Sequence, residues 1–248
     1  MKQLYLATLA CLGLAACEVV PVPAPQPAPA PQPAPAPQPT PAAAPTTDRI
    51  ATPREAARAF VAVVNQVEPM AERECRRRAP RLNCDFLIVV DDRPGVPANA
   101  FQTVDERGRP IIAFTLPLIE EARNRDEIAF ILAHEAAHHI EDHLSQQRRN
   151  AQIGAVVFGQ LAGEFGVAGD AVRSAQELGA VVGARTYSRD FELEADRLGT
   201  IIAAQAGFDP VRGAEFFFRI PDPGDQFLGT HPPNAQRVQV VLDTAASL

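Results

Sequence analysis

The sequence predicts an α+β domain that is mainly helical and carries a small, mostly antiparallel sheet. Three short runs rich in β-branched and other apolar residues lie together between residues 84 and 116, which predicts the sheet. Longer segments with apolar residues at helical spacing precede and follow these runs. Together the two patterns predict one folded domain over residues 46–248, with the functional site where sheet and helices meet.

Residues 1–16 have the pattern of a secretory signal peptide. Lys2 gives a short positive start, and the apolar run that follows is too short to span a membrane. It ends Leu14-Ala15-Ala16-Cys17, which resembles the bacterial lipobox, in which the cysteine is lipidated. Glu18 then resembles the default that sorts lipoproteins to the outer membrane of a Gram-negative bacterium. The alternative is an ordinary signal peptide without a lipid.

Residues 17–45 combine this cysteine with a linker built almost entirely of Pro, Ala, Gln and Val. Such a run cannot form a core and favours extended polyproline II. It is therefore either a semi-rigid spacer from the membrane or disordered filler. Both interpretations leave the domain tethered to the cell envelope, facing the periplasm.

Charge and cysteine usage fit an exported protein. Removal of residues 1–16 leaves 22 basic and 30 acidic side chains, a net charge of −8, which argues against a nucleic-acid partner. Cys75 and Cys84 are the cysteines left for the folded domain, and in an oxidising compartment we expect them to form a disulfide. Two free thiols, or cysteine ligation of a metal, are the alternatives.

The first elements follow from local signals. Thr52-Pro53-Arg54-Glu55 predicts a helix start with a capping box, and Pro69 is expected to kink or end this helix. Strands are predicted at residues 84–91, 98–104 and 111–116. The last two are joined by a short connection whose Gly108 suits a hairpin turn.

Helices are predicted for most of the remaining chain. One runs from about Glu127 to Gln147, capped by Asn124 or Asp126. The Gly- and Ala-rich residues 150–185 predict a loose helical hairpin, either ordinary packing helices or a mobile lid or membrane-facing flap. Further helices are predicted at residues 187–205, 210–218 and 234–245.

Inside the long predicted helix stands His134-Glu135-Ala136-Ala137-His138, an H-E-x-x-H motif. Residues four apart lie on one face of a helix, so the two imidazoles have the spacing that one zinc ion needs. Glu135 beside them can act on water at the metal. A catalytic zinc requires a third protein ligand, which the motif does not contain.

The helix at residues 187–205 offers Glu192, Glu194 and Asp196 as that ligand. Glu192 and Asp196 are four apart and share a face, whereas Glu194 points about 200° away from Glu192. We assign Glu192 to the metal. Asp196 can then accept the remaining N–H of a liganding imidazole and fix its tautomer. Glu194 as the ligand is the alternative.

Three segments together carry a resemblance to a known family. They are the H-E-x-x-H at residues 134–138, the E-x-x-A-D at residues 192–196 and the H-P-P at residues 231–233. In this order they resemble the gluzincin metallopeptidases of the CAAX-prenyl-protease and HtpX kind, and most of all their soluble periplasmic branch. The resemblance covers roughly residues 50–245. It implies a zincin-like fold with one Zn²⁺ per subunit.

The resemblance also implies roles. Glu135 is expected to be the catalytic base. His231 is expected to donate a hydrogen bond to the oxyanion or, in some relatives, to occupy the open zinc position as a latch. Arg237 is expected to anchor the His231 loop or to meet the carboxylates behind the site, and Tyr187 is a weaker candidate donor. We expect His139 and His143 to lie beside the site or face solvent.

The function that these observations predict is that of a zinc metalloendopeptidase for misfolded or unassembled envelope proteins. The exposed strand at residues 98–104 is the candidate edge for an extended peptide. The alternative is a zinc-containing chaperone or assembly factor with little proteolytic turnover. A purely structural zinc site needs no Glu135, so its presence favours the enzyme. A third possibility is a helical domain without metal that contains the motif by chance.

Overall fold

The structure, a computed structural model, describes residues 49–186, 188–222 and 231–248. The expected signal peptide, Cys17 and linker lie outside these residues, as does Tyr187. The described residues belong to one folded unit. In chain order its elements are α1 (Pro53–Arg78), β1 (Leu87–Asp91), β2 (Ala100–Val104), β3 (Pro110–Thr115), α2 (Leu116–Glu121), α3 (Arg125–Ile140), α4 (His143–Glu164), α5 (Asp170–Arg185), α6 (Ser188–Gln205), α7 (Pro210–Gly213), η2 (Ala214–Phe218) and α8 (Asn234–Ala245). The predicted α+β class, mainly helical, is confirmed.

Helix α1 begins as predicted but is longer than expected. Thr52 and Glu55 form the capping box. The helix continues through Pro69 to Arg78, so the expectation that Pro69 could end it is wrong. Asn65, whose carbonyl loses its partner, and Pro69 itself are both exposed, so water can satisfy that carbonyl. Apolar residues on both sides of the proline are buried and hold the helix on the core.

A disulfide joins Cys75 near the end of α1 to Cys84 just before β1. The predicted pairing is therefore present in the structure, and both sulfurs are unavailable to a metal. Both cysteines are buried in the main apolar core. The bond thus fixes the connection between the first helix and the sheet.

The sheet is mixed, with strand order β1-β3-β2. The predicted hairpin between β2 and β3 is present, and Gly108 in its turn has a φ of 77°. β1 pairs with β3 in parallel, so the sheet has one antiparallel and one parallel pairing. β3 is the most buried strand and takes the centre, which leaves β2 as an edge.

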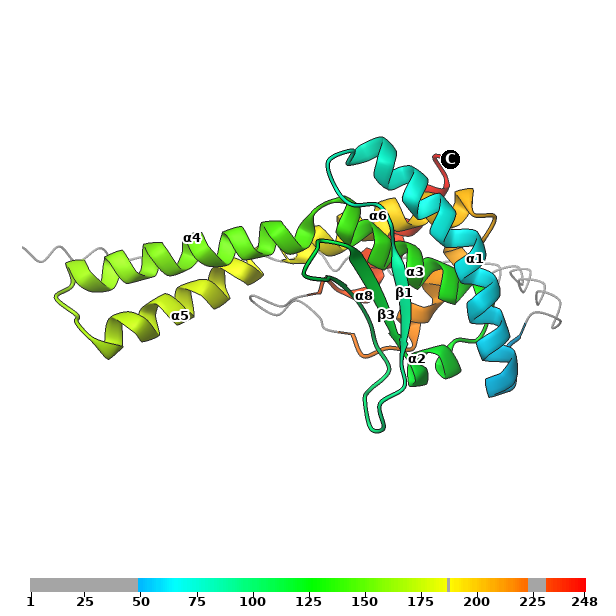
Figure 1. Ribbon diagram of the computed structural model, residues 1–248, viewed down its shortest axis with the longest axis horizontal. Helices are drawn as coiled ribbons and strands as arrows, with labels where there is room; N and C mark the ends of the chain where they lie inside the picture. The colour runs from blue at the N-terminus through cyan, green and yellow to red at the C-terminus, as the bar shows by residue number, and fades with distance from the viewer. Residues whose placement is uncertain (1–48, 187, 223–230) are drawn as a thin grey trace, which may run out of the picture. The chain divides into compact units, whose positions relative to one another are not determined.

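Helix α3, which carries the motif, lies at the centre of the fold (Figure 1) and packs on α1, α6, α7 and the sheet. It is buried on nearly every side. The predicted single helix over residues 127–147 is interrupted, because α3 ends at Ile140 and α4 begins at His143. Asp142 between them adopts the left-handed conformation with φ 56°, which Asp tolerates better than most residues.

Helix α6 approaches α3 closely at one point. Gly199 faces the backbone of His134, and a Cβ atom built there would lie 3.0 Å from the His134 Cα atom. A larger residue would push the helices apart. The contact therefore brings the acidic residues of α6 within reach of the histidines on α3.

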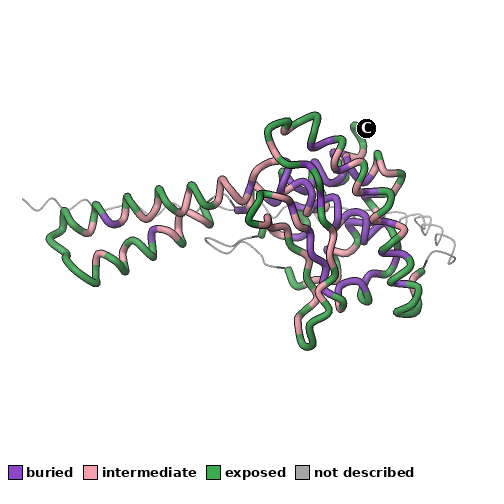
Figure 2. The backbone as a smooth tube through the Cα atoms, viewed as in Figure 1, coloured by how far each residue is buried: buried purple, intermediate pink, exposed green. Residues whose placement is uncertain are grey.

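Helices α4 and α5 form the predicted hairpin and pack closely through Gly154, Gly179 and Gly183, where an added Cβ would meet backbone atoms of the facing helix. Figure 2 shows most of the hairpin as exposed or half-buried. Its exposed apolar side chains include Ile153, Val156, Leu161, Phe165 and Leu178. Among the described residues, no helix has the length and apolar character needed to cross a membrane.

Candidate metal centre

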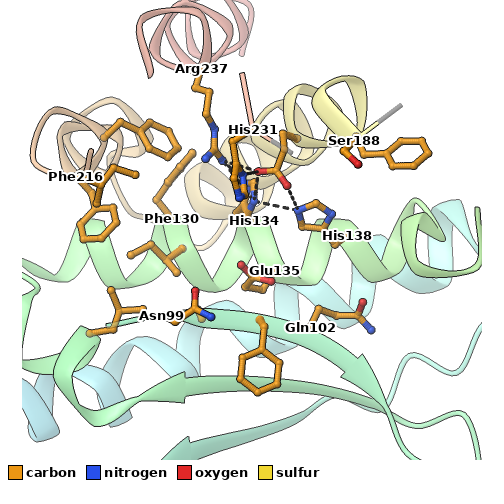
Figure 3. A pocket seen from close by; sticks show the side chains of 18 of the residues that line it. Asn99, Gln102, Phe130, His134, Glu135, His138, Ser188, Phe216, His231 and Arg237 are labelled. Carbon is orange, nitrogen blue, oxygen red and sulfur yellow. Dashed lines mark hydrogen bonds and ion pairs between the residues drawn. The ribbon is translucent and has the colours of Figure 1, made fainter. Parts of the chain in front are cut away.

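A cavity of about 620 Å³ opens beside α3. Its walls come from α3, α6, η2, α8 and the β2 edge, and it is lined by both charged and aromatic side chains. Figure 3 shows His134, His138 and His231 gathered above Glu135, with Asn99 and Gln102 of the β2 side on the opposite wall. The cavity therefore joins the predicted site residues to an exposed strand edge, at the boundary between sheet and helices.

His134, His138 and Glu192 bring three potential metal-binding atoms together, all within 4.8 Å of one another. The two Nε2 atoms are 3.0 Å apart. Glu192 Oε2 lies 3.5 Å from His134 Nε2, and Oε1 lies 3.4 Å from His138 Nε2. The structure thus brings Glu192 of α6 to the two histidines of α3, although at least 54 positions separate them in the sequence.

These distances suit zinc. Tetrahedral ligands with bonds of 2.0–2.1 Å lie about 3.3 Å from one another. Two imidazoles and one carboxylate are also the donor set of many catalytic zinc sites, which leave one position for water. The three residues therefore fit a zinc ion in both chemistry and spacing.

Behind His134 stand Asp196 and Arg237. His134 Nδ1 lies 2.9 Å from Asp196 Oδ1, and Arg237 donates to both Asp196 oxygens at 2.7 Å. Asp196 is fully buried, so this bidentate pairing compensates for the loss of hydration. Asp196 makes the contact with a histidine N–H that was expected of it. Arg237 was expected either to anchor the His231 loop or to meet these carboxylates, and in the structure it contacts Asp196.

The buried carboxylates of the centre stabilise positive charge on the histidines beside them. Burial lowers the pKa of His134, but hydrogen bonds to Asp196 and Glu192 outweigh it and raise the pKa to about 10. Burial raises the pKa of Glu192, but hydrogen bonds from His134, His138 and His231 hold it well below its usual value. The carboxylate is therefore ionised and stabilises positive charge beside it.

His231 also reaches the cluster, with Nδ1 3.1 Å from Glu192 Oε2 and a half-exposed side chain. The residues just before it, 223–230, lie outside the described part of the chain. Glu135 projects into the same cavity from α3 and is partly exposed. The two predicted catalytic side chains thus line one cavity with the three candidate ligands.

Glu194, the alternative ligand, lies elsewhere. It is about half exposed and its Oε2 is 3.0 Å from His143 Nε2. His143 Nδ1 in turn is 3.0 Å from His138 Nδ1. Burial lowers the pKa of His143, and the neighbouring His138 lowers it further. His139 turns away and lies 2.7 Å from the Asn83 carbonyl.

The contact between His143 and Glu194 was not predicted from the sequence. The signal was present in the unusual density of the histidines, since four of five fall between residues 134 and 143. The contact could not be derived from helical spacing, because a continuous straight helix would place His143 about 140° around the helix axis from His138.

The α+β fold and the H-E-x-x-H helix facing a glutamate on a second helix define a metallopeptidase of the gluzincin kind. The chain belongs to peptidase family M48, whose sequence profile matches residues 60–245. This confirms the resemblance seen in the motifs.

Two relatives are similar in sequence to part of this chain. It is 35% identical over 118 residues to the putative beta-barrel assembly-enhancing protease of Vibrio cholerae, a match that covers 45% of this chain and 24% of the relative. It is 28% identical over 125 residues to the beta-barrel assembly-enhancing protease of Yersinia pestis, covering 44% and 25%. The chain therefore spans about a quarter of the length of these relatives.

Proposed function

We propose that this chain is a zinc-dependent endopeptidase of the cell envelope, with residues 46–248 as its peptidase domain. One observation carries the proposal: three donor atoms at zinc spacing and Glu135 share a cavity with an exposed strand edge. His134, His138 and Glu192 would hold the zinc ion, which would supply Lewis-acid chemistry to activate a water molecule and polarise the scissile carbonyl.

Glu135 is the base in this proposal. Its carboxylate accepts a proton from the attacking water as the water oxygen bonds to the carbonyl carbon. When the carbon–nitrogen bond breaks, Glu135 gives that proton to the leaving amine. The partial exposure of Glu135 in the cavity leaves it accessible to water and substrate.

His231 completes the catalytic set. An N–H donor aimed at the developing oxyanion stabilises the transition state more than the ground state. Its ring stands beside Glu192 at the cavity, and its half-exposed side chain allows reorientation toward a bound carbonyl. Its contact with Glu192 also supports the second role that the family resemblance implies, in which His231 occupies the open position on the metal and keeps the enzyme inactive.

The β2 edge suits an extended substrate. Ala98, Asn99, Phe101 and Gln102 line the cavity, and β3 pairs with β2 on one side only. A peptide can add along the other side through backbone hydrogen bonds, which depend little on sequence. Phe130, Phe216 and Phe217 provide apolar surface for side chains near the cleaved bond. Loose specificity of this kind suits misfolded or unassembled proteins.

The envelope location is supported by the sequence and by the relatives. The signal-like residues 1–16 and Cys17 support a periplasm-facing lipoprotein, held to the outer membrane by its lipid. Two relatives named for β-barrel assembly support unfolded or misassembled envelope proteins as substrates.

A substrate trap tests this function. The Glu135→Gln variant, expressed in its host and crosslinked, is expected to retain unfolded or unassembled envelope proteins. The double variant Glu135→Gln/Glu192→Ala, which lacks a metal ligand, is the control and should retain fewer. Wild-type protein should then cleave the trapped proteins in vitro. Binding without cleavage would instead establish the chaperone alternative, and equal recovery by trap and control would contradict the proposed substrate class.

A further inference from the structure

In both His134 and His138, the ring nitrogen Nδ1, which a metal at Nε2 leaves free, contacts a second side chain. His134 Nδ1 contacts the Asp196 carboxylate directly. His138 Nδ1 contacts the imidazole of His143, which in turn contacts the Glu194 carboxylate. We propose that His143 is a positioning residue for the ligand His138, and that Glu194 positions His143 in turn. This inference rests on the proposed zinc site.

When His138 binds a metal through Nε2, one arrangement of protons satisfies both the His138–His143 and the His143–Glu194 contacts. A neutral His138 that offers its Nε2 lone pair to a metal carries its proton on Nδ1. That N–H can donate to His143 Nδ1, 3.0 Å away, only if His143 Nδ1 is unprotonated. His143 then carries its proton on Nε2 and donates it to Glu194 Oε2 at 3.0 Å. The Glu194 carboxylate, as the hydrogen-bond acceptor at the end, therefore sets the tautomers of both rings.

The opposite tautomer of His143 loses both contacts. A proton on its Nδ1 would face the N–H of His138, and the bare Nε2 would face the carboxylate. Such a ring would drive His138 either to rotate or to move its proton to Nε2, the nitrogen that the metal needs. The order His138, His143, Glu194 thus favours the metal-binding form of His138.

The fold holds His143 in place for this contact. The left-handed turn at Asp142 ends α3 and starts α4 at His143, so the ring returns to the side of His138. Phe191 of α6 stacks on it, with ring centroids 4.5 Å apart and planes at 17°. The ring is buried, with 4% of the side chain exposed. Packing thus fixes the ring plane while Glu194 fixes its proton.

Zinc affinity tests the inference without depending on turnover. We expect His143→Phe, which keeps the stacking but removes the acceptor, to raise the zinc dissociation constant roughly 10- to 100-fold. His139→Phe is the matched control, because His139 is also buried and lies on α3 but contacts the Asn83 carbonyl instead. Its zinc dissociation constant should stay within about threefold of wild type. Competition with a chromophoric chelator on the purified full chain measures both.

Two more variants separate positioning from folding. In His143→Asn the amide oxygen can replace Nδ1 as acceptor, so this variant should recover much of the affinity that His143→Phe loses. Glu194→Ala alters a half-exposed side chain and should raise the dissociation constant by a smaller factor without affecting folding. The visible spectrum of the Co²⁺-substituted protein should change in His143→Phe and not in His139→Phe.

The outcomes distinguish this inference from the proposed function. If wild-type protein binds no zinc, the zinc site itself is wrong and the inference falls with it. If wild-type protein binds zinc and cleaves substrate while His143→Phe and Glu194→Ala match the His139→Phe control, the positioning role is wrong and the peptidase stands. Weakened zinc binding in His143→Phe, recovered in His143→Asn, supports the inference.

Discussion

Glu135→Gln is expected to lower kcat/KM for an unfolded casein-like substrate by about 10²–10⁴-fold, the usual contribution of a general base. The amide is almost the same size as the carboxylate but cannot accept the proton of the attacking water. Zinc content should remain unchanged, because the three candidate ligands are His134, His138 and Glu192. Cleavage of a fluorescent substrate and elemental analysis of the same sample measure both quantities.

The matched control is Glu141→Gln, the same substitution at the C-cap residue that follows the last residue of α3, Ile140. It should leave both cleavage and zinc content close to wild type. Full activity in Glu135→Gln would show that another group activates water. Loss of activity in both variants would point to a general effect on α3 instead of a catalytic role for Glu135.

Glu192→Ala is expected to remove zinc, whereas Glu194→Ala keeps about one zinc per chain when the metal is in excess. The two glutamates are two residues apart on α6, yet Glu192 lies among the histidine Nε2 atoms and Glu194 contacts His143. Alanine at position 192 leaves two ligands, too few for a tightly bound catalytic ion. Elemental analysis after dialysis checks the zinc content of both variants.

Thermal unfolding of both metal-free variants provides the control for folding, since each should still show one cooperative transition. The opposite result, zinc lost in Glu194→Ala and kept in Glu192→Ala, would transfer the ligand role to Glu194. If both Glu192→Ala and Glu194→Ala retained zinc, the third ligand would be another residue.

The candidate ligands could be predicted because helix geometry is local. Residues four apart share a face wherever the helix lies, so His134 with His138 and Glu192 with Asp196 follow from spacing alone. The capping box at Thr52 is equally local and is present in the structure. The two helices that carry the candidate ligands must also be brought together by a tertiary contact, which the close approach at Gly199 provides.

Features that depend on distant packing could not be predicted. The left-handed turn at Asp142 gives no strong signal in sequence, and without it His143 would point away from His138. Strand order is similarly hidden, because burial of β3 against the helices, rather than its place in the chain, makes it central. Pro69 is accommodated because Asn65, whose carbonyl it deprives of a helical partner, is exposed, and that exposure is determined by the fold.

Zinc titration of chelator-treated wild-type protein shows whether one bound zinc ion makes this protein an active peptidase. The full chain is stripped of metal, and cleavage of the unfolded substrate is followed as zinc is added. We expect no cleavage without metal and a linear recovery that ends at about one zinc per chain, one ion for one three-ligand site. Cleavage that persists in the metal-free protein, or protein that binds zinc without gaining activity, would contradict this expectation.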